Sequence, residues 1–239
     1  MKIFFLRIAN FFHPVTCSVC GDDLSFLSQT KICDKCKESF PVIKNLLCQK
    51  CGMPLYDGGE YCCICKKHPK EYAFDKMRSV YLYKDSLRSL ILKFKYSGRS
   101  FLARDFGLYM YEAMKLHSFY NDAEFIIIPV PLNIVRRIKR GYNQAELLAN
   151  EISIKAGIPI LRNVLSRKKI TKPQFKLSKL ERAKNIKDSF FVKNSGILKS
   201  KSVILIDDIA TTSATVSACS LALKTVGTKK VYVLTLARD

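Results

Sequence analysis

The spacing of apolar residues predicts three amphipathic helices in the middle of the chain. Apolar residues recur three and four positions apart over 87–97, 101–116 and 144–155, which is the period of a helix with one buried face. In the first of these helices, Lys95 falls on the outward, charged face. Gly98 lies just past its end, where helices often terminate.

Short apolar runs between the helices predict the strands of a sheet. Buried strands are expected at 125–128, 158–161, 203–206 and 230–236, and a looser alternation at 79–83 predicts an edge strand. Each run is too short for a helix of average length. Strands alternating with helices predict an α/β fold in which helices flank a sheet.

The run V-I-L-I-D-D-I-A-T-T-S-A-T, residues 203–215, carries the strongest chemical signal. Asp207 and Asp208 follow the buried strand, small and hydroxyl residues come next, and a helix is predicted from about Ser213. Small side chains let a phosphate approach the backbone, and the free N–H groups of a helix start favour its charge. Carboxylates accept hydrogen bonds from vicinal hydroxyls or bind near Mg²⁺. The pattern predicts a sugar-phosphate site; the alternative is a buried strand with an acidic helix cap.

This segment resembles the ribose-phosphate signature of the type I phosphoribosyltransferases, which use phosphoribosyl pyrophosphate (PRPP) with Mg²⁺. The resemblance implies that Asp207 and Asp208 are the catalytic residues and hold the ribose hydroxyls. It implies that the 5′-phosphate is held by the loop residues Ala210, Thr211, Thr212, Ser213, Ala214 and Thr215. That family usually has glycine where this chain has Ser213. Glycine accepts a positive φ more readily, so the departure bears on ligand affinity.

A second predicted strand ends at Pro129 and leads into a basic segment. Ligands of doubly wound sheets bind outside the carboxyl ends of the strands. The same resemblance implies that the loop with Val130, Pro131 and Leu132 binds pyrophosphate, with Arg137 or a neighbouring arginine in reach. It also implies that residues 167–187 form a loop that closes over the substrate and excludes water. The alternative for that segment is a solvated basic connector.

Nine of the ten cysteines lie in the first 65 residues. Eight of them form four C-x-x-C pairs, Cys17/Cys20, Cys33/Cys36, Cys48/Cys51 and Cys62/Cys65, and Cys63 is left over. Two such turns supply four thiolates to one tetrahedral zinc ion, so four pairs predict two structural zinc sites. We expect consecutive pairs to share an ion; an interleaved arrangement, or Cys63 in place of Cys62, is the alternative. A disulfide framework is the competing interpretation, which a cytosolic setting disfavours.

Length predicts two domains, and charge predicts an anionic partner. Its 239 residues predict a cysteine-rich double zinc-binding domain over 1–73 and an α/β domain over 74–239. Lys and Arg number 41 against 20 Asp and Glu, a net charge of +21, which predicts affinity for nucleic acid, phosphorylated ligands or an anionic membrane surface. Eighteen of these cations and only four acidic residues lie between Pro131 and Lys201.

Hydropathy favours a cytoplasmic protein. No apolar stretch reaches the ~18–20 residues of a membrane span. The N-terminal segment resembles a signal peptide only superficially, because Arg7 interrupts its apolar run and no small-residue cleavage site follows. We expect a short amphipathic helix that docks on the body of the protein; contact with a membrane surface is the alternative.

Several motifs occur together in one order along the whole chain. The cysteine-rich segment is followed by L-R-S-L-I-L-K-F-K-Y-S-G, P-V-P-L, R-G-Y-N-Q, T-K-P-Q, an L-S-x-x-E-R-x-x-N run and D-D-I-A-T-T-S-A-T. This combination resembles the ComF family of competence proteins. The resemblance implies a type I phosphoribosyltransferase-like parallel sheet and a cytoplasmic protein of natural transformation. It implies a role in handling incoming single-stranded DNA, beside a competence helicase and near the inner membrane.

Two functional hypotheses follow from these observations. In the first, the chain is an enzyme that releases pyrophosphate from Mg²⁺-bound PRPP, with nucleotide or base salvage as the runner-up role. In the second, the chain is a binding module for single-stranded DNA, with PRPP or another phosphorylated ligand. Candidates for base stacking are Tyr142, Phe175, Phe190 and Phe191. For Phe190 and Phe191 a position in the core is the favoured interpretation.

Overall fold

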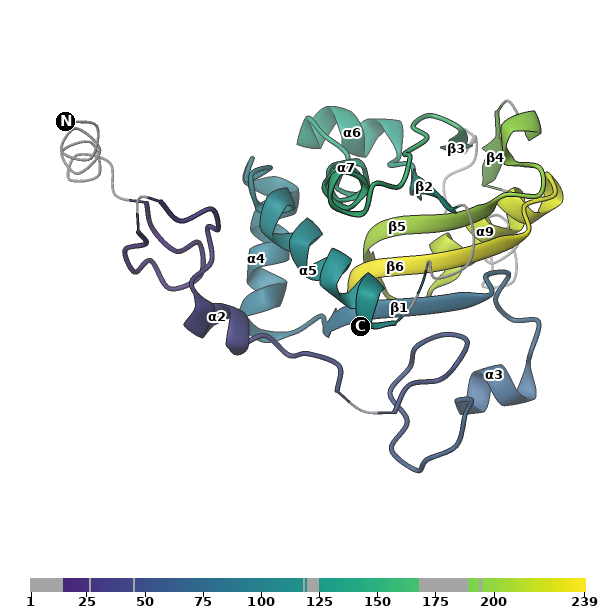
Figure 1. Cartoon of the computed structure of the whole chain (residues 1–239), viewed down its shortest axis with the longest axis horizontal. Coiled ribbons are helices and arrows are strands. Elements are labelled where there is room, and N and C mark those ends of the chain that lie inside the picture. Colours follow the sequence, from purple (N-terminus) through teal and green to yellow (C-terminus); the bar gives the residue numbers. More distant parts are fainter. Residues whose placement is uncertain are drawn as a thin grey trace, which may run out of the picture.

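A four-stranded parallel sheet lies at the centre of the protein (Figure 1). The computed structural model describes residues 15–25, 27–44, 46–117, 119, 125–167, 189–193 and 195–239. The strands stand in the order β1 (Lys76–Leu82), β6 (Lys230–Arg238), β5 (Ser202–Ala210) and β2 (Phe125–Pro129). All three neighbouring pairs are parallel, which confirms the predicted α/β fold class.

Helices cover both faces of the sheet. On one face pack α5 (Leu102–Leu116) and α7 (Gln144–Ala156), with α4 (Asp85–Tyr96) beside them, and α9 (Ala214–Thr225) covers the other face (Figure 1). The apolar stripes predicted for these helices face the core, as the complete burial of Leu87 and Phe106 illustrates. Two hydrophobic clusters result, one on each face of the sheet.

The backbones of α5 and α7 approach each other closely at Gly107. A Cβ atom at this position would lie 2.3 Å from the Cβ of Glu151, which is far inside van der Waals contact. Only glycine fits there, so the sequence at this point fixes how closely the two helices pack.

Two of the predicted strands differ from the structure. The strand expected at 203–206 extends through Asp207 and Asp208 to Ala210, because β6 continues beside it as far as Arg238. The strand expected at 158–161 reduces to a single parallel bridge between Ile127 and Ile160. Both residues of the acidic pair therefore lie within a regular strand, near its carboxyl end.

Four short elements of the α/β part were not expected from the sequence. A helix, α6 (Ile134–Arg140), follows the loop after β2, and β3 (Leu165–Arg167) pairs antiparallel with β4 (Phe190–Val192). A 3₁₀ turn, η2 (Ser195–Leu198), precedes β5. Their apolar residues are too few to produce a readable period, so the sequence pattern did not reveal them.

The cysteine-rich segment runs along the free edge of the sheet. Residues between its two halves pair with β1: the amide of Ile43 donates to the carbonyl of Val80 (3.3 Å), and that of Leu82 donates to Pro41 (2.9 Å). The half with α2 (Asp34–Glu38) lies against α4 and α5, and the half with α3 (Cys63–Lys67) lies below β1 (Figure 1). The segment thus satisfies an edge that would otherwise expose unpaired backbone groups.

The two halves share the core of the α/β part rather than forming a core of their own. Cys36 and Phe40 belong to the cluster on the face of α4 and α5, whereas Cys48 and Cys51 belong to the cluster of α9. A domain boundary near residue 73 stays a prediction. The N-terminal helix expected before residue 15, the closing loop expected at 167–187 and its Phe175 lie outside the described residues, apart from Arg167.

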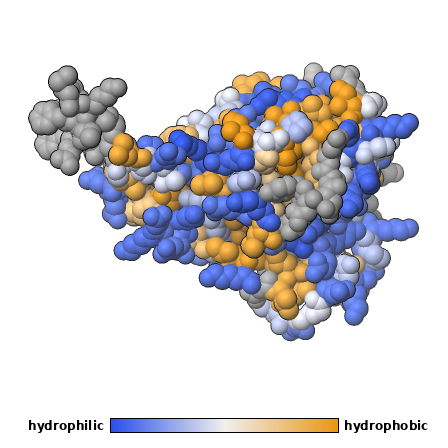
Figure 2. Space-filling view, in the orientation of Figure 1, coloured by the Kyte–Doolittle hydropathy of each residue, from blue (hydrophilic) through white to orange (hydrophobic). Residues whose placement is uncertain are grey.

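Within the described ranges, none of the helices combines the length and the hydropathy that crossing a bilayer requires. Figure 2 shows one face of the surface, where hydrophilic residues predominate and hydrophobic patches lie between them.

Candidate functional site

In each half of the N-terminal segment, four cysteines converge on a centre of their own. The groups are Cys17, Cys20, Cys33 and Cys36, and Cys48, Cys51, Cys62 and Cys65, with ligand atoms within 4.8 Å of one another. The Sγ atoms of Cys20 and Cys33 lie 3.8 Å apart and those of Cys51 and Cys62 lie 3.6 Å apart. Tetrahedral zinc with Zn–S bonds of ~2.3 Å places its sulfurs about 3.8 Å apart, so the donors fit the ion.

Consecutive pairs share each group, as expected, and the interleaved alternative is wrong. None of the ten cysteines forms a disulfide, so the disulfide framework is wrong. Cys63 is exposed and belongs to neither group. Each first C-x-x-C turn closes on a glycine: the amides of Gly21 and Gly52 donate to the carbonyls of Cys17 and Cys48, both at 3.0 Å. The sites are closed, with four protein ligands and no open position, as structural zinc sites are.

The acidic pair lies at the carboxyl end of β5. Asp208 is 8% exposed, and its Oδ2 lies 3.2 Å from Nζ of Lys95. Oδ1 of Asp207 accepts a hydrogen bond from the amide of Asp208 (2.8 Å). Burial, and then the charge of Asp208, raise the pKa of Asp207 to about 8. Two carboxylates beside one lysine leave the pair in need of a hydroxyl donor or a cation.

The side chain of Lys95 was expected on the outward face of its helix, and that prediction is wrong. Lys95 lies in the last turn of α4, where its long side chain reaches over the carboxyl ends of the strands. Only 14% of it is exposed. A charged residue assigned to solvent by helical period is therefore a part of the site.

The loop between β5 and α9 surrounds a small hollow of about 30 Å³. Its lining includes Asp207 and the predicted loop residues Ala210, Thr211, Thr212, Ser213, Ala214 and Thr215. Because α9 starts at Ala214, its first amides lie at this hollow. The side chains of Thr211, Thr212 and Thr215 are exposed. The amide of Ala214 donates to the hydroxyl of Thr212 (3.4 Å). A hollow with amides and hydroxyls at a helix start suits a phosphate group.

Ser213 adopts a backbone conformation that glycine accepts more readily than serine. Its φ is 59° and its ψ is 6°, in the left-handed region, which costs a non-glycine residue about 1 kcal/mol or more. The side chain is only 5% exposed, and its hydroxyl donates to Sδ of Met77 at 3.6 Å. Serine at this position therefore has a left-handed backbone and directs its hydroxyl into the body of the protein.

A larger cavity of about 310 Å³ adjoins the acidic pair. It is lined by the predicted residues Val130, Pro131 and Leu132, by Asp207, Asp208, Thr211 and Thr215, and by several basic and amide side chains from other elements. Asn143 fixes the first of these loops, since its Nδ2 donates to the carbonyl of Val130 (3.0 Å). Segments far apart in sequence thus meet at the carboxyl edge of the sheet.

Cations from three elements line this cavity: Lys95, Arg136, Arg140 and Arg167. Arg140 donates to Oε1 of Gln144 (3.0 Å) and to the hydroxyl of Tyr96 (2.8 Å), which holds its guanidinium in place. Burial and the charge of Arg136 lower the pKa of Arg167. The concentration of positive charge suits a polyanionic ligand.

One buried amide faces the cavity without a partner. Gln144 is 1% exposed, and its Nε2 has no hydrogen-bond partner among the described residues. A buried donor left unpaired costs free energy, so this amide is a candidate for contact with a ligand.

Arg137 does not line the cavity, in contrast to its neighbours on α6. Its side chain is 52% exposed, and its Nη2 lies 3.9 Å from a carboxylate oxygen of Glu146. The side chain of Asn133 caps α6 by accepting from the amide of Val135 (3.0 Å), and this start sets which residues of the helix face inward. The sequence did not reveal the helix, so it could not separate Arg136 and Arg140 from Arg137.

The candidate stacking residues lie in different surroundings. Tyr142 is half-buried, and its ring packs against Phe94 with centroids 6.0 Å apart. Phe190 is 5% exposed, which confirms its expected place in the core, whereas Phe191 is 38% exposed, so a core position for it is wrong. Tyr96, which the sequence did not single out, is 60% exposed.

A parallel α/β domain with two four-cysteine zinc-binding sites along its edge is the class of protein that these observations define. Residues 8–66 match the double zinc ribbon domain family, which together with the two four-cysteine groups establishes two structural zinc sites. The chain is 32% identical to competence protein F of Haemophilus influenzae over 235 residues, covering 96% of this chain and 99% of that protein. It is 27% identical to competence protein ComFC of Bacillus subtilis over 216 residues, covering 85% and 86%. The chain belongs to the ComF family of competence proteins.

Solved structures with a related arrangement include a hypoxanthine phosphoribosyltransferase from Staphylococcus aureus. The similarity covers 57% of this chain and 65% of that chain, with 14% identity and a TM-score of 0.36. At this score the similarity carries no argument, and the fold class rests on the observed strand order.

Proposed function

We propose that this ComF-type protein binds Mg²⁺-PRPP, or a closely related phosphorylated ligand, and handles single-stranded DNA during natural transformation. One observation carries the proposal. The acidic pair, the hollow of residues 210–215, the loop 130–132 and four cations surround adjoining cavities at the carboxyl edge of the sheet. Few ligands combine a diol with phosphates on both sides of it, and PRPP does.

The chemistry of each part supports one role in such a complex. Asp207 and Asp208 would accept hydrogen bonds from the ribose hydroxyls and attract Mg²⁺. The amides and hydroxyls of residues 211–215 would hold the 5′-phosphate. The loop 130–132 would hold the pyrophosphate, with Arg136 and Arg140 neutralising its charge. Arg137, which pairs with Glu146, has no role in this proposal.

A calorimetric titration tests the proposal. Mg²⁺-PRPP is titrated into the zinc-loaded protein and into the Asp207→Asn/Asp208→Asn variant. We expect saturable binding to the parent and its loss in the variant, because amides do not replace two anionic acceptors. Arg137→Ala is the matched control and retains the parent affinity. Absence of binding to the intact protein would contradict the proposal.

The surface beside the cavity supports contact with a nucleic-acid backbone. Four of the seven residues of α6 are basic and none is acidic. The guanidinium carbon of Arg140 lies 4.7 Å from the ring centroid of Tyr96, and Tyr96 is 60% exposed. Phe191 is also exposed, near Lys193. Exposed rings among cations are the parts from which single-strand sites are built, so we propose Tyr96 and Phe191 as stacking residues.

Salt dependence tests the DNA proposal. Each phosphate contact with single-stranded DNA contributes about 0.7 to the slope of log K against log salt. Arg137→Ala/Lys139→Ala should therefore lower the slope by about 1.4 while PRPP affinity stays unchanged. Lys66→Ala/Lys67→Ala on α3 removes the same charge far from α6 and serves as control. Equal slopes in all three proteins would contradict a site on α6.

The remaining expectations complete the proposal. We propose a cytoplasmic location near the inner membrane and work beside a competence helicase, both implied by the family. The runner-up function is a phosphoribosyltransferase of base salvage, and the unpaired amide of Gln144 at the cavity would then contact the acceptor. Release of pyrophosphate from PRPP on addition of a nucleobase would favour that function over binding alone.

A further inference from the structure

Two buried arginines hold the first turn of the second zinc site. Arg78 on β1 donates through Nη1 to the carbonyls of Cys48 (3.1 Å) and Gln49 (3.2 Å). Arg238 on β6 donates through Nη1 to the carbonyl of Cys51 (2.8 Å). Their exposures are 4% and 3%. Neighbouring strands of the central sheet thus bind the same turn.

These two guanidinium groups need a compensating charge. A buried cation without a partner is costly, and no carboxylate of the described residues forms an ion pair with Arg78 or Arg238. Four thiolates around one zinc ion carry a net charge of about −2. The filled second site therefore supplies the anion that the pair of arginines requires.

Met77 on β1 contacts both the Cys48–Cys51 turn and Ser213 of the phosphate loop, residues 210–215. The amide of Met77 donates to the carbonyl of Lys50 (2.7 Å), and a Cβ at Gly52 would lie 2.6 Å from the carbonyl oxygen of Met77. The turn and β1 are therefore in direct backbone contact. On its other side, the fully buried Met77 accepts the hydroxyl of Ser213 at Sδ.

A second contact joins this region to the start of α9. The amide of Ala73, between the second zinc site and β1, donates to the hydroxyl of Ser217 (3.1 Å). Ser217 lies in the first turn of α9, and its own amide donates to the carbonyl of Ser213 (2.9 Å). The strained residue of the phosphate loop is thus held from two directions by the second zinc segment.

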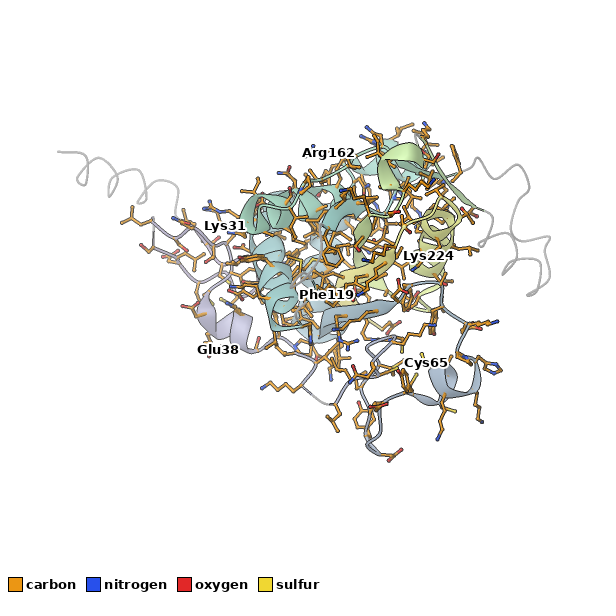
Figure 3. The ribbon with its side chains drawn as sticks, turned by 45° about the vertical axis from the view of Figure 1, so that its right-hand side comes forward. Lys31, Glu38, Cys65, Phe119, Arg162 and Lys224 are labelled. Carbon is orange, nitrogen blue, oxygen red and sulfur yellow. The ribbon has the colours of Figure 1, made fainter. Side chains whose placement is uncertain are left out.

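The first zinc site makes different contacts. The amide of Lys31 donates to Oδ2 of Asp105 on α5 (2.9 Å), and Nζ of Lys93 on α4 donates to the carbonyl of Ser18 (3.3 Å). In Figure 3, Lys31 lies beside these helices and Cys65 lies at the opposite end of the segment, below the sheet. None of the described contacts joins the first site to residues 211–217.

We propose that the second zinc site positions the phosphate loop. Its filled cysteine turn balances Arg78 and Arg238, and Met77 carries the position of that turn to Ser213. Loss of zinc from this site releases the left-handed conformation of Ser213, whereas loss from the first site leaves it in place. The consequence for PRPP rests on the proposed function; the order of the loop does not.

Hydrogen exchange of the ligand-free, full-length protein tests the inference. Cys62→Ser/Cys65→Ser is compared with Cys33→Ser/Cys36→Ser, after metal analysis has established one zinc ion in each. We expect amides 211–217 to exchange about tenfold faster than in the parent in the first variant only. Equal exchange in the two variants, or faster exchange only in the second, overturns the inference.

Met77→Ala keeps every zinc ligand, so it tests the same link even if a cysteine variant misfolds. It should retain two zinc ions and the parent circular dichroism, yet exchange amides 211–217 faster. Met114→Ala, a buried methionine on α5, is the matched control and should leave those amides unchanged. Parent-like exchange in Met77→Ala overturns the role of Met77. Because no ligand is present, these results stand whether or not the parent binds PRPP.

Discussion

The raised pKa of Asp207 leads to a prediction about stability. Its carboxyl is held near Asp208 in a desolvated position, which raises its pKa from 3.8 to about 8. Asp207→Asn removes the charge and keeps the Oδ1 acceptor for the amide of Asp208. The variant should therefore be more stable than the parent at neutral pH and should lose the function of the site. Such a trade-off between stability and activity is common when a functional residue is replaced.

The magnitude follows from the linkage between protonation and folding. A raised carboxyl pKa means that the folded state binds the proton more tightly, so the parent loses stability as the pH rises from about 4 to about 8. At pH 7, about 3 units above the unfolded value, linkage sets an upper bound of roughly 4 kcal/mol. Since Asp207 is partly exposed at the cavity, water reduces this, and we expect about 1–2 kcal/mol.

Urea denaturation at several pH values provides the assay. The gain in unfolding free energy of Asp207→Asn over the parent should be near zero at pH 4, rise with pH and level off above pH 8. Lys95→Met is the contrasting variant: it leaves the carboxylate of Asp208 without its cation and should destabilise the protein at pH 7 by about 1–3 kcal/mol. A gain for Asp207→Asn that is the same at pH 4 and pH 8, or a loss, would refute the reasoning.

Three further outcomes are expected. Gly107→Ala should cost about 1–3 kcal/mol in urea denaturation because α5 and α7 must separate, whereas Gly196→Ala, which meets no atom within 4 Å, should be neutral; equal effects would contradict the close packing. Ser213→Val should cost about 2 kcal/mol through its left-handed backbone, and Ser213→Gly should not; thermal unfolding distinguishes them, and a tolerated valine would argue against the observed φ. Denatured protein should release two zinc ions per chain to a colorimetric chelator, and a single ion would be inconsistent with two filled sites.

The period of apolar residues was sufficient to predict the long helices and most of the strands. Four of the predicted strands and all of the predicted helices within the described ranges are present, because long amphipathic segments record their burial in the sequence. The strand expected at 158–161 has too few partners to extend beyond the bridge at Ile160. The acidic pair and the small-residue loop were found because their chemistry is contiguous along the chain.

The sequence pattern could not identify the residues that reach the site from other elements. Lys95 belongs to the polar face of an amphipathic helix, and only the position of that helix above the strand ends turns it towards Asp208. Which arginine of α6 points inward depends on the cap at Asn133. Arg78 and Arg238 carry no motif, and their role appears only when the cysteine turn packs on the sheet edge.

The structure of the zinc-loaded protein crystallised with Mg²⁺ and PRPP would test the central claim most directly. The account predicts the 5′-phosphate against residues 211–215, the ribose hydroxyls on Asp207 and Asp208, and the pyrophosphate on the loop 130–132 beside Arg136 and Arg140. A ligand bound elsewhere on the chain, with both carboxylates free of it, would contradict the account.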